Sequence, residues 1–381
     1  MTPDRADVHV PVLTDGVVTL RAHHRGDVDG VEEQGSDPVS QRWTTVPVPY
    51  SRADAERFVT EVVPEGWSRG GWAFAVEAPD AEGRPRFCGT VELRDEGNRR
   101  AEVAYGAHPW ARGRGILLRA LHLLLEWGFT EQRLRTVIWW ANTGNWASRR
   151  VAWRLGFSCD GTLERWLPQR GDLLDAWVGV LHVDGARAPR HDWLEPPSLV
   201  GEGVALRPLR DEDAARVAEA CDDALTARWL DGLPSPYTVQ DAHAYLQHTR
   251  EQHASATGMH WALVEPGSDE LVGCISLTSL VPGREAEVGY WLHPRARGRG
   301  LMTEACGMVA RQSLAGRDVG GLGLHRLTVA AAEGNAGSLR VIEANGFTLV
   351  GRERQALRLR DGRPVDALRY DVLADEYAAS G

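Results

Sequence analysis

The sequence lacks the features that mark secreted and membrane proteins. Its five cysteines form no CxxC or other paired spacing, and an odd number of unpaired thiols fits a reducing cytoplasm better than a disulfide framework. No stretch approaches the about 18 apolar residues that a membrane-spanning helix needs. The N-terminal segment MTPDRADVHVP has no apolar signal-peptide core. We therefore expect a cytoplasmic protein.

Positive charge is also in short supply. Lysine and arginine total 43 against 53 aspartate and glutamate residues, which gives a net charge of −10. Such a chain is not attracted to nucleic acid or to an anionic membrane surface, although a local basic loop can still bind a small anion. At 381 residues the chain is long for one hydrophobic core, and a prior of about 150 residues per domain suggests two or three domains.

An internal repeat organises the sequence. The segment Ala101–Gly115, AEVAYGAHPWARGRG, recurs as AEVGYWLHPRARGRG at Ala286–Gly300. Farther along, Asn145–Phe157 is matched by Asn335–Phe347, with five extra residues in the glycine-rich loop Gly316–Gly323. Self-similarity over this length indicates duplication.

The duplication predicts two domains of the same fold. We expect a flexible tail at 1–12, an N-terminal domain at 13–183 and a C-terminal domain at 201–375. A linker rich in proline and charge joins them at 184–200. Strands and helices alternate within each copy, which predicts an α/β fold with a mixed sheet flanked by helices.

The pattern of the first copy predicts its main elements. Prolines exclude a helix from Arg42–Tyr50, which we expect to be extended. Helical spacing of apolar residues behind Ser51 predicts a helix over Ser51–Val63. The later elements are predicted, in order, as strand Arg100–Ala107, helix Arg114–Phe129, strand Arg135–Trp140, helix Asn145–Gly156 and strand Leu174–Leu181.

Each copy places a basic, glycine-containing loop between a strand and a helix start. A helix start presents unpaired N–H groups and the positive end of the helix dipole. Glycines allow close approach of a phosphate, and arginines add positive charge. The loop is neither a Walker loop nor a dinucleotide fingerprint. We predict a phosphate or pyrophosphate site at Arg112, Gly113, Arg114 and Gly115, and at Arg297, Gly298, Arg299 and Gly300.

These motifs resemble the GNAT acyltransferases, in particular the RimJ/RimL-like branch of ribosomal-protein N-terminal acetyltransferases. The family's donor motif is Gln/Arg-x-x-Gly-x-Gly/Ala, and both copies fit its first four positions. The sixth position, normally tiny, is Leu117 in one copy and Met302 in the other. The resemblance covers both repeats. It implies two tandem GNAT folds, each a splayed mixed sheet, with acetyl-CoA or another acyl-CoA as co-substrate and no metal.

The resemblance also implies roles for particular residues. A splayed strand carries Glu102 or Glu287, which would act as base on the acceptor amine, while a backbone N–H of that strand stabilises the oxyanion. Ser148 or Ser338 would assist the leaving thiolate. For Asn145 and Asn335, which would face the coenzyme arm, and for both serines, helix capping is the alternative. For Glu102 and Glu287, the alternative is that each is a solvated or ion-paired strand residue without a catalytic role.

Tryptophan is abundant, with fifteen residues. Most are expected in the core, but some fall where the resembled family builds its acceptor cleft. They could wall an apolar or peptide-like acceptor or a longer acyl chain. The candidate cleft residues are Trp43, Tyr50, Trp229 and Tyr237.

The resemblance predicts transfer of an acyl group from acyl-CoA to a primary amine of a small molecule, peptide or protein N-terminus. Attack is expected to be direct, because neither motif holds a cysteine that could carry the acyl group. The tandem copies mimic a dimer in one chain, which favours a monomer, and the donor loop slightly favours the C-terminal copy as the active one. Two alternatives stay open: acylation of a natural-product or peptide amine from a long-chain acyl-CoA or an acyl carrier protein, and a non-catalytic acyl-CoA-binding or interaction module.

Overall fold

The computed structural model describes residues 9–230 and 232–379. The chain divides into two compact units, 1–190 and 191–381, here called unit 1 and unit 2. Part of the expected tail, residues 1–8, lies outside the described residues. Irregular backbone follows unit 1's last strand, but the last two residues of the expected linker form strand β9, Leu199–Val200. The domain limits 13–183 and 201–375 stay predictions.

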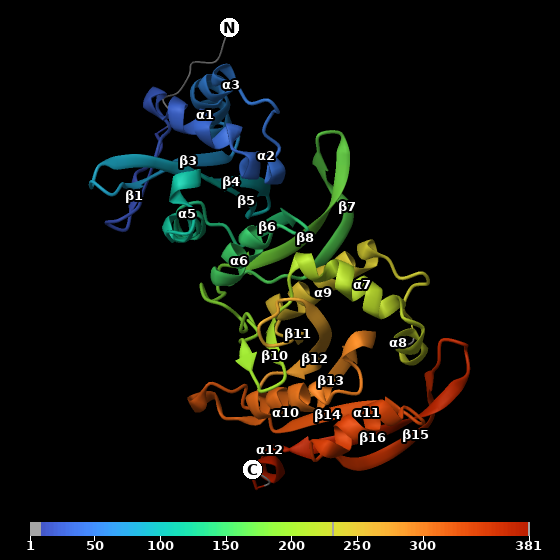
Figure 1. Ribbon diagram of the computed structural model, residues 1–381. Coiled ribbons are helices and arrows are strands. Elements are labelled where there is room, and N and C mark those ends of the chain that lie inside the picture. Colours follow the sequence, from blue (N-terminus) through green and yellow to red (C-terminus); the bar gives the residue numbers. More distant parts are fainter. Residues whose placement is uncertain (1–8, 231, 380–381) are drawn as a thin grey trace. The chain divides into compact units, whose positions relative to one another are not determined.

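Unit 1 is built on one eight-stranded mixed sheet with the order β1-β2-β3-β4-β5-β6-β8-β7 (Figure 1). All neighbours are antiparallel except β5 and β6, which are parallel. The strands are β1 Leu13–Thr14, β2 Thr19–Arg21, β3 Gly71–Pro79, β4 Pro85–Gly97, β5 Arg100–Ala107, β6 Thr136–Asn142, β7 Gly161–Gln169 and β8 Asp172–His182. The helices are α1 Val28–Ser36, α2 Pro38–Trp43, α3 Arg52–Arg57, α4 Val63–Trp67, α5 Ile116–Thr130 and α6 Trp146–Arg154.

Unit 2 repeats this sheet with the order β15-β16-β14-β13-β12-β11-β10-β9. Its parallel pair is β13 and β14. The further strands are β10 Ala205–Pro208, β11 Met259–Val264, β12 Leu271–Val281, β13 Glu285–Leu292, β14 Arg326–Ala332, β15 Thr348–Arg358 and β16 Pro364–Leu373. The helices are α7 Ala214–Asp222, α8 Ala224–Trp229, α9 Val239–Ala254, α10 Leu301–Leu314, α11 Ala336–Ala344 and α12 Ala374–Ala379.

Helices cover each sheet on two sides. In unit 1, α5 buries Leu121, Leu124 and Leu125 against one face, as its helical spacing predicts. On the other face α1 and α3 cover β3 and β4, with Val31 and Phe87 in a smaller cluster. Figure 1 shows α5 on the side of the sheet opposite to α1 and α3. Strand β11 of unit 2, MHWALV, is buried at all six positions, because helices pack on both of its faces.

Three local expectations need correction. Arg42 and Trp43 are not extended but end helix α2, which begins at Pro38 behind the N-cap Asp37; proline is tolerated at that first helical position. The expected helix Ser51–Val63 continues to Trp67 through a π-helical turn at Phe58–Val62. Strand β7 and its unit 2 counterpart β15 were not expected. Strand β7 is exposed at most positions, so it shows no alternation of buried and exposed residues.

Candidate active site

The parallel strands of each unit pair only at their beginnings. In unit 1, β5 pairs with β6 from Arg100↔Thr136 to Val103↔Trp139. Strand β5 then continues to Ala107, still paired with β4 on its other side. In unit 2, the β13–β14 ladder ends after its third pair, although β13 continues to residue 292. A gap therefore opens between the two strands in each sheet, as the splayed-strand expectation requires.

Backbone N–H groups point into this gap. The His108 N–H donates to a carbonyl of β4 at 2.8 Å. Because successive N–H groups of a strand point in opposite directions, those of Tyr105 and Ala107 point toward the departing β6. The same alternation holds in unit 2, where the His293 N–H donates to a carbonyl of β12 at 2.9 Å. Such donors are suited to stabilise an oxyanion.

The glycine loop ends directly at a helix start. Gly113 and Gly115 adopt φ of 73° and 74°, and Gly115 is the N-cap of α5, without a side-chain cap. A Cβ atom on either glycine would meet nothing within 4 Å, so the backbone is accessible from outside. Gly298 and Gly300 repeat this with φ of 74° and 77°. A tetrahedral anion can reach the N–H groups of the helix start here, and pyrophosphate binding at the loop stays a prediction.

The first arginine of each loop has a partner within its own unit. Arg112 donates to Asp37 Oδ2 at 2.6 Å and to Ser40 Oγ at 3.0 Å. Burial alone would raise the pKa of Asp37, but the hydrogen bonds from Arg112 and the Ser40 N–H hold that pKa below its ordinary value. Arg297 binds Asp223 in the same way, at 2.5 Å. These arginines tie the loop to the start of α2 or α8, and direct phosphate contact stays a prediction.

The second arginine of each loop has a different partner in each unit. The Arg114 guanidinium lies over the Trp110 ring, 5.2 Å from its centroid. Arg299 forms an ion pair with Glu265. Half of the Arg299 side chain is nevertheless exposed, so it can reach an anion at the loop. Its phosphate contact, like that of Arg114, stays a prediction.

A tyrosine and a serine meet on the side of the gap that α6 covers. The Tyr105 hydroxyl lies 2.9 Å from Ser148 Oγ, and Trp139 Nε1 donates to both oxygens at 3.1 Å. Unit 2 repeats the pair, with Tyr290 Oη 2.9 Å from Ser338 Oγ. These tyrosines are not among the predicted site residues, although each is the last residue of the repeated segment AEV-x-Y.

The asparagines hold the serines in place. Asn145 is the N-cap of α6, and its Oδ1 accepts the Ser148 N–H at 3.2 Å. Asn335 accepts the Ser338 N–H at the same distance. The capping role is therefore present in both copies. It does not conflict with the expected contact to a coenzyme arm, which stays a prediction.

The tyrosine hydroxyls are protonated at neutral pH. Burial raises the pKa of Tyr105 to about 12, although its hydrogen bonds to Ser148 and Trp139 act in the opposite direction. Burial also raises the pKa of Tyr290 above its ordinary value. A protonated phenol beside a serine hydroxyl can donate a proton to a leaving thiolate. The assistance to the leaving thiolate that we expected from the serine hydroxyl alone can thus come from the Tyr–Ser pair.

The two candidate bases have different surroundings. Burial raises the pKa of Glu102, even though Arg94 at 3.4 Å opposes the shift. Glu287 instead accepts a hydrogen bond from Arg369 at 3.3 Å, and Arg369 also binds Glu353 at 3.1 Å. A carboxylate with a raised pKa is the stronger base. Both glutamates are ion-paired, Glu102 with Arg94 and Glu287 with Arg369. The raised pKa makes Glu102 the better candidate base, and the role of either glutamate stays a prediction.

The expected cleft residues do not all lie at one surface. Trp43 approaches Gly144, where a Cβ atom would come within 3.6 Å of its ring, and thus lies near the end of β6. Trp229 ends α8 and is only partly buried. Tyr237 is 8% exposed and packs among α7 and α9, and Tyr50 packs against α1 at Gly35. Acceptor contact by these four residues stays a prediction.

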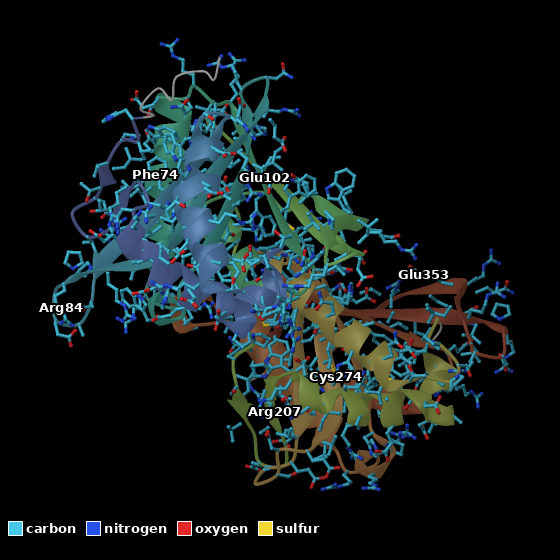
Figure 2. The ribbon with its side chains drawn as sticks, turned by 90° about the horizontal axis from the view of Figure 1, so that it is seen from above. Phe74, Arg84, Glu102, Arg207, Cys274 and Glu353 are labelled. Carbon is cyan, nitrogen blue, oxygen red and sulfur yellow. The ribbon has the colours of Figure 1, made fainter. Side chains whose placement is uncertain are left out.

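Hydrogen bonds of Gln169 connect the β7–β8 hairpin to the segment around Trp43. Gln169 at the end of β7 donates to the carbonyls of Arg42 and Thr44 at 2.9 and 3.1 Å, and accepts from Asn142 at 2.6 Å. The segment after α2 and the β7–β8 hairpin are thereby joined across the end of β6. Together they border the sheet face that carries Glu102, labelled in Figure 2.

Comparisons with known proteins agree with this geometry. The family model described as "Acetyltransferase (GNAT) domain" matches the chain twice, over residues 18–158 and 204–348. The chain belongs to the GNAT acetyltransferases. The predicted family and the two tandem α/β domains are thereby confirmed.

Several relatives of this GNAT acetyltransferase carry related names. "Putative ribosomal N-acetyltransferase YdaF" of Bacillus subtilis is 31% identical over 182 residues, covering 47% of this chain and 95% of that protein. "Ribosomal-protein-serine acetyltransferase" of Escherichia coli is 34% identical over 95 residues, covering 24% of this chain and 50% of that protein. A solved structure of RimL with coenzyme A has 21% identity and a TM-score of 0.42, and covers 47% of this chain and 98% of that one.

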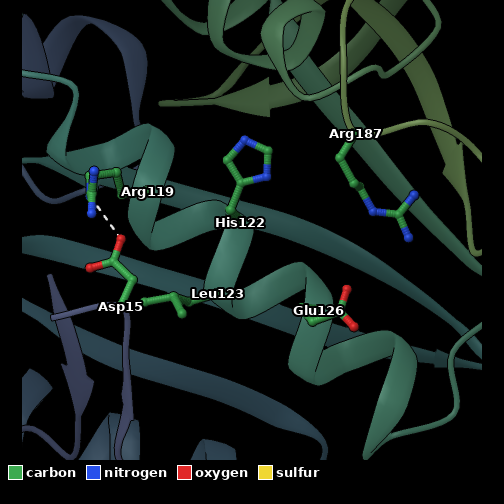
Figure 3. A pocket seen from close by; sticks show the side chains of 6 residues that line it. All are labelled: Asp15, Arg119, His122, Leu123, Glu126 and Arg187. Atoms are coloured by element: carbon green, nitrogen blue, oxygen red, sulfur yellow. Dashed lines mark ion pairs between the residues drawn. The ribbon is translucent and has the colours of Figure 1, made fainter. Parts of the chain in front are cut away.

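A hollow of about 440 Å³ in this GNAT acetyltransferase lies apart from the gap, along α5. Figure 3 shows the Asp15–Arg119 ion pair (2.7 Å) at one end and His122 and Glu126 on the same helix.

Within the part of the chain that the structure describes, no three His, Cys, Asp or Glu residues are grouped to hold a metal ion. In that part, no helix has the length and apolar character to cross a bilayer.

Proposed function

We propose that this GNAT acetyltransferase transfers an acetyl or related acyl group from acyl-CoA to a primary amine by direct attack. The observation that carries the proposal is the repeated grouping, in both units, of an open glycine loop at a helix start, a strand gap lined by N–H donors, and a half-buried Tyr–Ser pair. The pyrophosphate would lie at the loop, and the thioester arm in the gap.

The residues then have separate tasks. Glu102 would remove a proton from the acceptor amine, directly or through water, so that the neutral nitrogen attacks the thioester carbon. The N–H groups of Tyr105 and Ala107 would stabilise the oxyanion. When the carbon–sulfur bond breaks, the Tyr105–Ser148 pair would donate a proton to the thiolate. The amide and the free thiol are the products, and the relatives' names suggest a ribosomal protein as one acceptor.

Calorimetric titration of acetyl-CoA into the full chain tests the proposal. Gly115→Glu and Gly300→Glu place a carboxylate where the pyrophosphate would lie, and each is expected to remove one binding site. Gly83→Glu is the matched control, because Gly83 also has a left-handed φ (78°) and open space around it, but lies in the β3–β4 turn. The Gly83→Glu variant should keep every acetyl-CoA binding site of the wild type.

Release of free thiol from acetyl-CoA with an amine acceptor completes the test. The chain contains no lysine, so acylation of the enzyme itself at side-chain amines does not obscure the product. Thiol release that needs both the amine and an intact loop supports the proposal. Wild-type protein that binds no acyl-CoA, or loop variants that bind as well as Gly83→Glu, would overturn it.

A further inference from the structure

On the sheet face that carries the candidate base, strands β6, β7 and β8 of unit 1 present apolar side chains where unit 2 has polar, charged or small ones, although the base of unit 1 is itself ion-paired with Arg94 of β4. Residues of one strand alternate between its two faces, so Glu102 shares its face with its β6 partner Ile138 and with Trp140. Val178 of β8 pairs with Trp140 and lies on the same face. Leu163 of β7 pairs with Ala176 and thus lies there too. We call Ile138, Trp140, Leu163, Trp166 and Val178 the apolar face.

Two tryptophans form the outer part of the apolar face. The rings of Trp140 and Trp166 are stacked, with 5.8 Å between centroids and 27° between planes. Trp166 is nevertheless 54% exposed and Leu163 is 37% exposed. An aromatic ring of this size normally lies mostly inside a protein, so its exposure beside the candidate base marks a surface available to a ligand.

Unit 2 carries different side chains at the matched positions. The repeat aligns Ile138 with Thr328, Trp140 with Ala330, Leu163 with Glu353, Trp166 with Ala356, and Val178 with Arg369. The alignment is anchored by structure, since the bulge residues Arg165 and Gln355 each donate a backbone N–H to an aspartate of the next strand, Asp175 or Asp366. The same fold thus supports either surface, and the apolar face is not needed to build the sheet.

Ion pairs join the charged side chains of unit 2. Arg369 bridges Glu287 and Glu353 at 3.3 and 3.1 Å. Figure 2 labels Glu353 on the β15–β16 hairpin and Glu102 of unit 1. An apolar acceptor would have to desolvate this ion-paired group, which is unfavourable. In unit 1 the charged group on this face is the Arg94–Glu102 pair of β4 and β5, and the five matched positions on β6, β7 and β8 carry apolar side chains.

We propose that unit 1 selects amines that carry an aromatic or large aliphatic group, held on the apolar face by Trp140, Trp166 and Leu163. This inference rests on the proposed function and names the acceptor class of that site. Along β6, Trp140 lies about 7 Å beyond the partner of Glu102, at about 3.3 Å per residue. That distance lets one small molecule place its amine near the carboxylate and its ring on the tryptophans.

Matched amines test the proposal on the full chain. In the Gly300→Glu background, which leaves the unit 1 loop intact, we compare acetylation of phenylalanine amide with that of serine amide. We expect a higher kcat/KM for phenylalanine amide, and Trp166→Ala should reduce this preference by about tenfold. Leu173→Ala is the control, since Leu173 is 57% exposed but alternates to the other face of β8. In the Gly115→Glu background the preference should be absent.

A binding measurement separates this inference from the proposed function. Calorimetric titration of the two amides into the protein with free CoA reports on the apolar face without turnover. Binding of phenylalanine amide that Trp166→Ala weakens, in a protein that acetylates neither amide, keeps the inference and overturns the proposed function. Equal acetylation of both amides, unchanged by Trp166→Ala, overturns the inference alone. Absence of both binding and acetylation overturns both.

Discussion

Unit 2 should lose stability in mild acid because of a buried histidine. His260 on β11 is 3% exposed. Its Nε2 lies 2.5 Å from Gln252 Oε1, and among the described residues its Nδ1 has no hydrogen-bond partner. His253 of α9 accepts the His260 backbone N–H through its own Nε2 at 3.0 Å, a bond that requires this nitrogen to be unprotonated. The site is built for neutral imidazole.

The expected loss follows from the pKa difference. Burial, together with the nearby His253 and His248, lowers the pKa of His260 from 6.5 to about 3. The unfolded chain therefore binds a proton below pH 6.5 that the folded chain does not, and stability falls as the pH falls from 6.5 toward 3. Between pH 7 and pH 5 this one group lowers the free energy of unfolding by about 2 kcal/mol. Most carboxylates stay ionised over the same interval.

The variant His260→Gln removes the titration and keeps a donor for Gln252. The free energy of unfolding is obtained from urea titrations at pH 7 and pH 5, read by labelling of buried thiols with a disulfide reagent. Peptide-resolved mass spectrometry then assigns the label: Cys274 reports on unit 2 and Cys88 on unit 1, and both thiols are buried. Between the two pH values, wild type should lose about 2 kcal/mol more at Cys274 than the variant does. Equal losses in the two proteins would refute the reasoning, while the signal from Cys88 should not depend on the substitution.

Two further substitutions examine the chemistry of unit 1. Tyr105→Phe should lower kcat by about 100-fold without changing the affinity for acetyl-CoA, since it removes one proton donor. Tyr290→Phe reports on the same step in unit 2. An unchanged kcat in both variants would exclude the tyrosine hydroxyls as proton donors to the thiolate. The activity of wild type with an uncharged acceptor should decline as the pH falls through the raised pKa of Glu102, because the protonated carboxyl cannot accept a proton. Glu102→Gln should be slow and lack this decline, and a variant with the wild-type pH profile would contradict the assignment.

The sequence alone predicted the parts of the site that depend on local pattern. Strand Arg100–Ala107 has the predicted bounds, and the long helix starts two residues later than predicted because Gly113 and Gly115 adopt left-handed backbone. The ion pair of Arg112 with Asp37 joins residues 75 positions apart, and no pattern in a single sequence indicates such a contact. The Tyr–Ser pair was missed for the same reason, although its tyrosine stands in the repeated motif.

The two units share the Tyr–Ser pair, the asparagine cap and the glycine loop, and they differ on the sheet face opposite the Tyr–Ser pair. The Tyr–Ser contact is 2.9 Å and the Asn–Ser cap is 3.2 Å in both units, and the glycine loops share their backbone angles. These features lie on the side of the gap that α6 or α11 covers, or at the end of the gap, where an acyl-CoA would bind. The differences gather on the opposite sheet face. Because strand alternation separates the two faces, that face could exchange tryptophan and leucine for alanine and glutamate without disturbing the donor side. Acceptor chemistry is therefore the property in which the two units are free to differ.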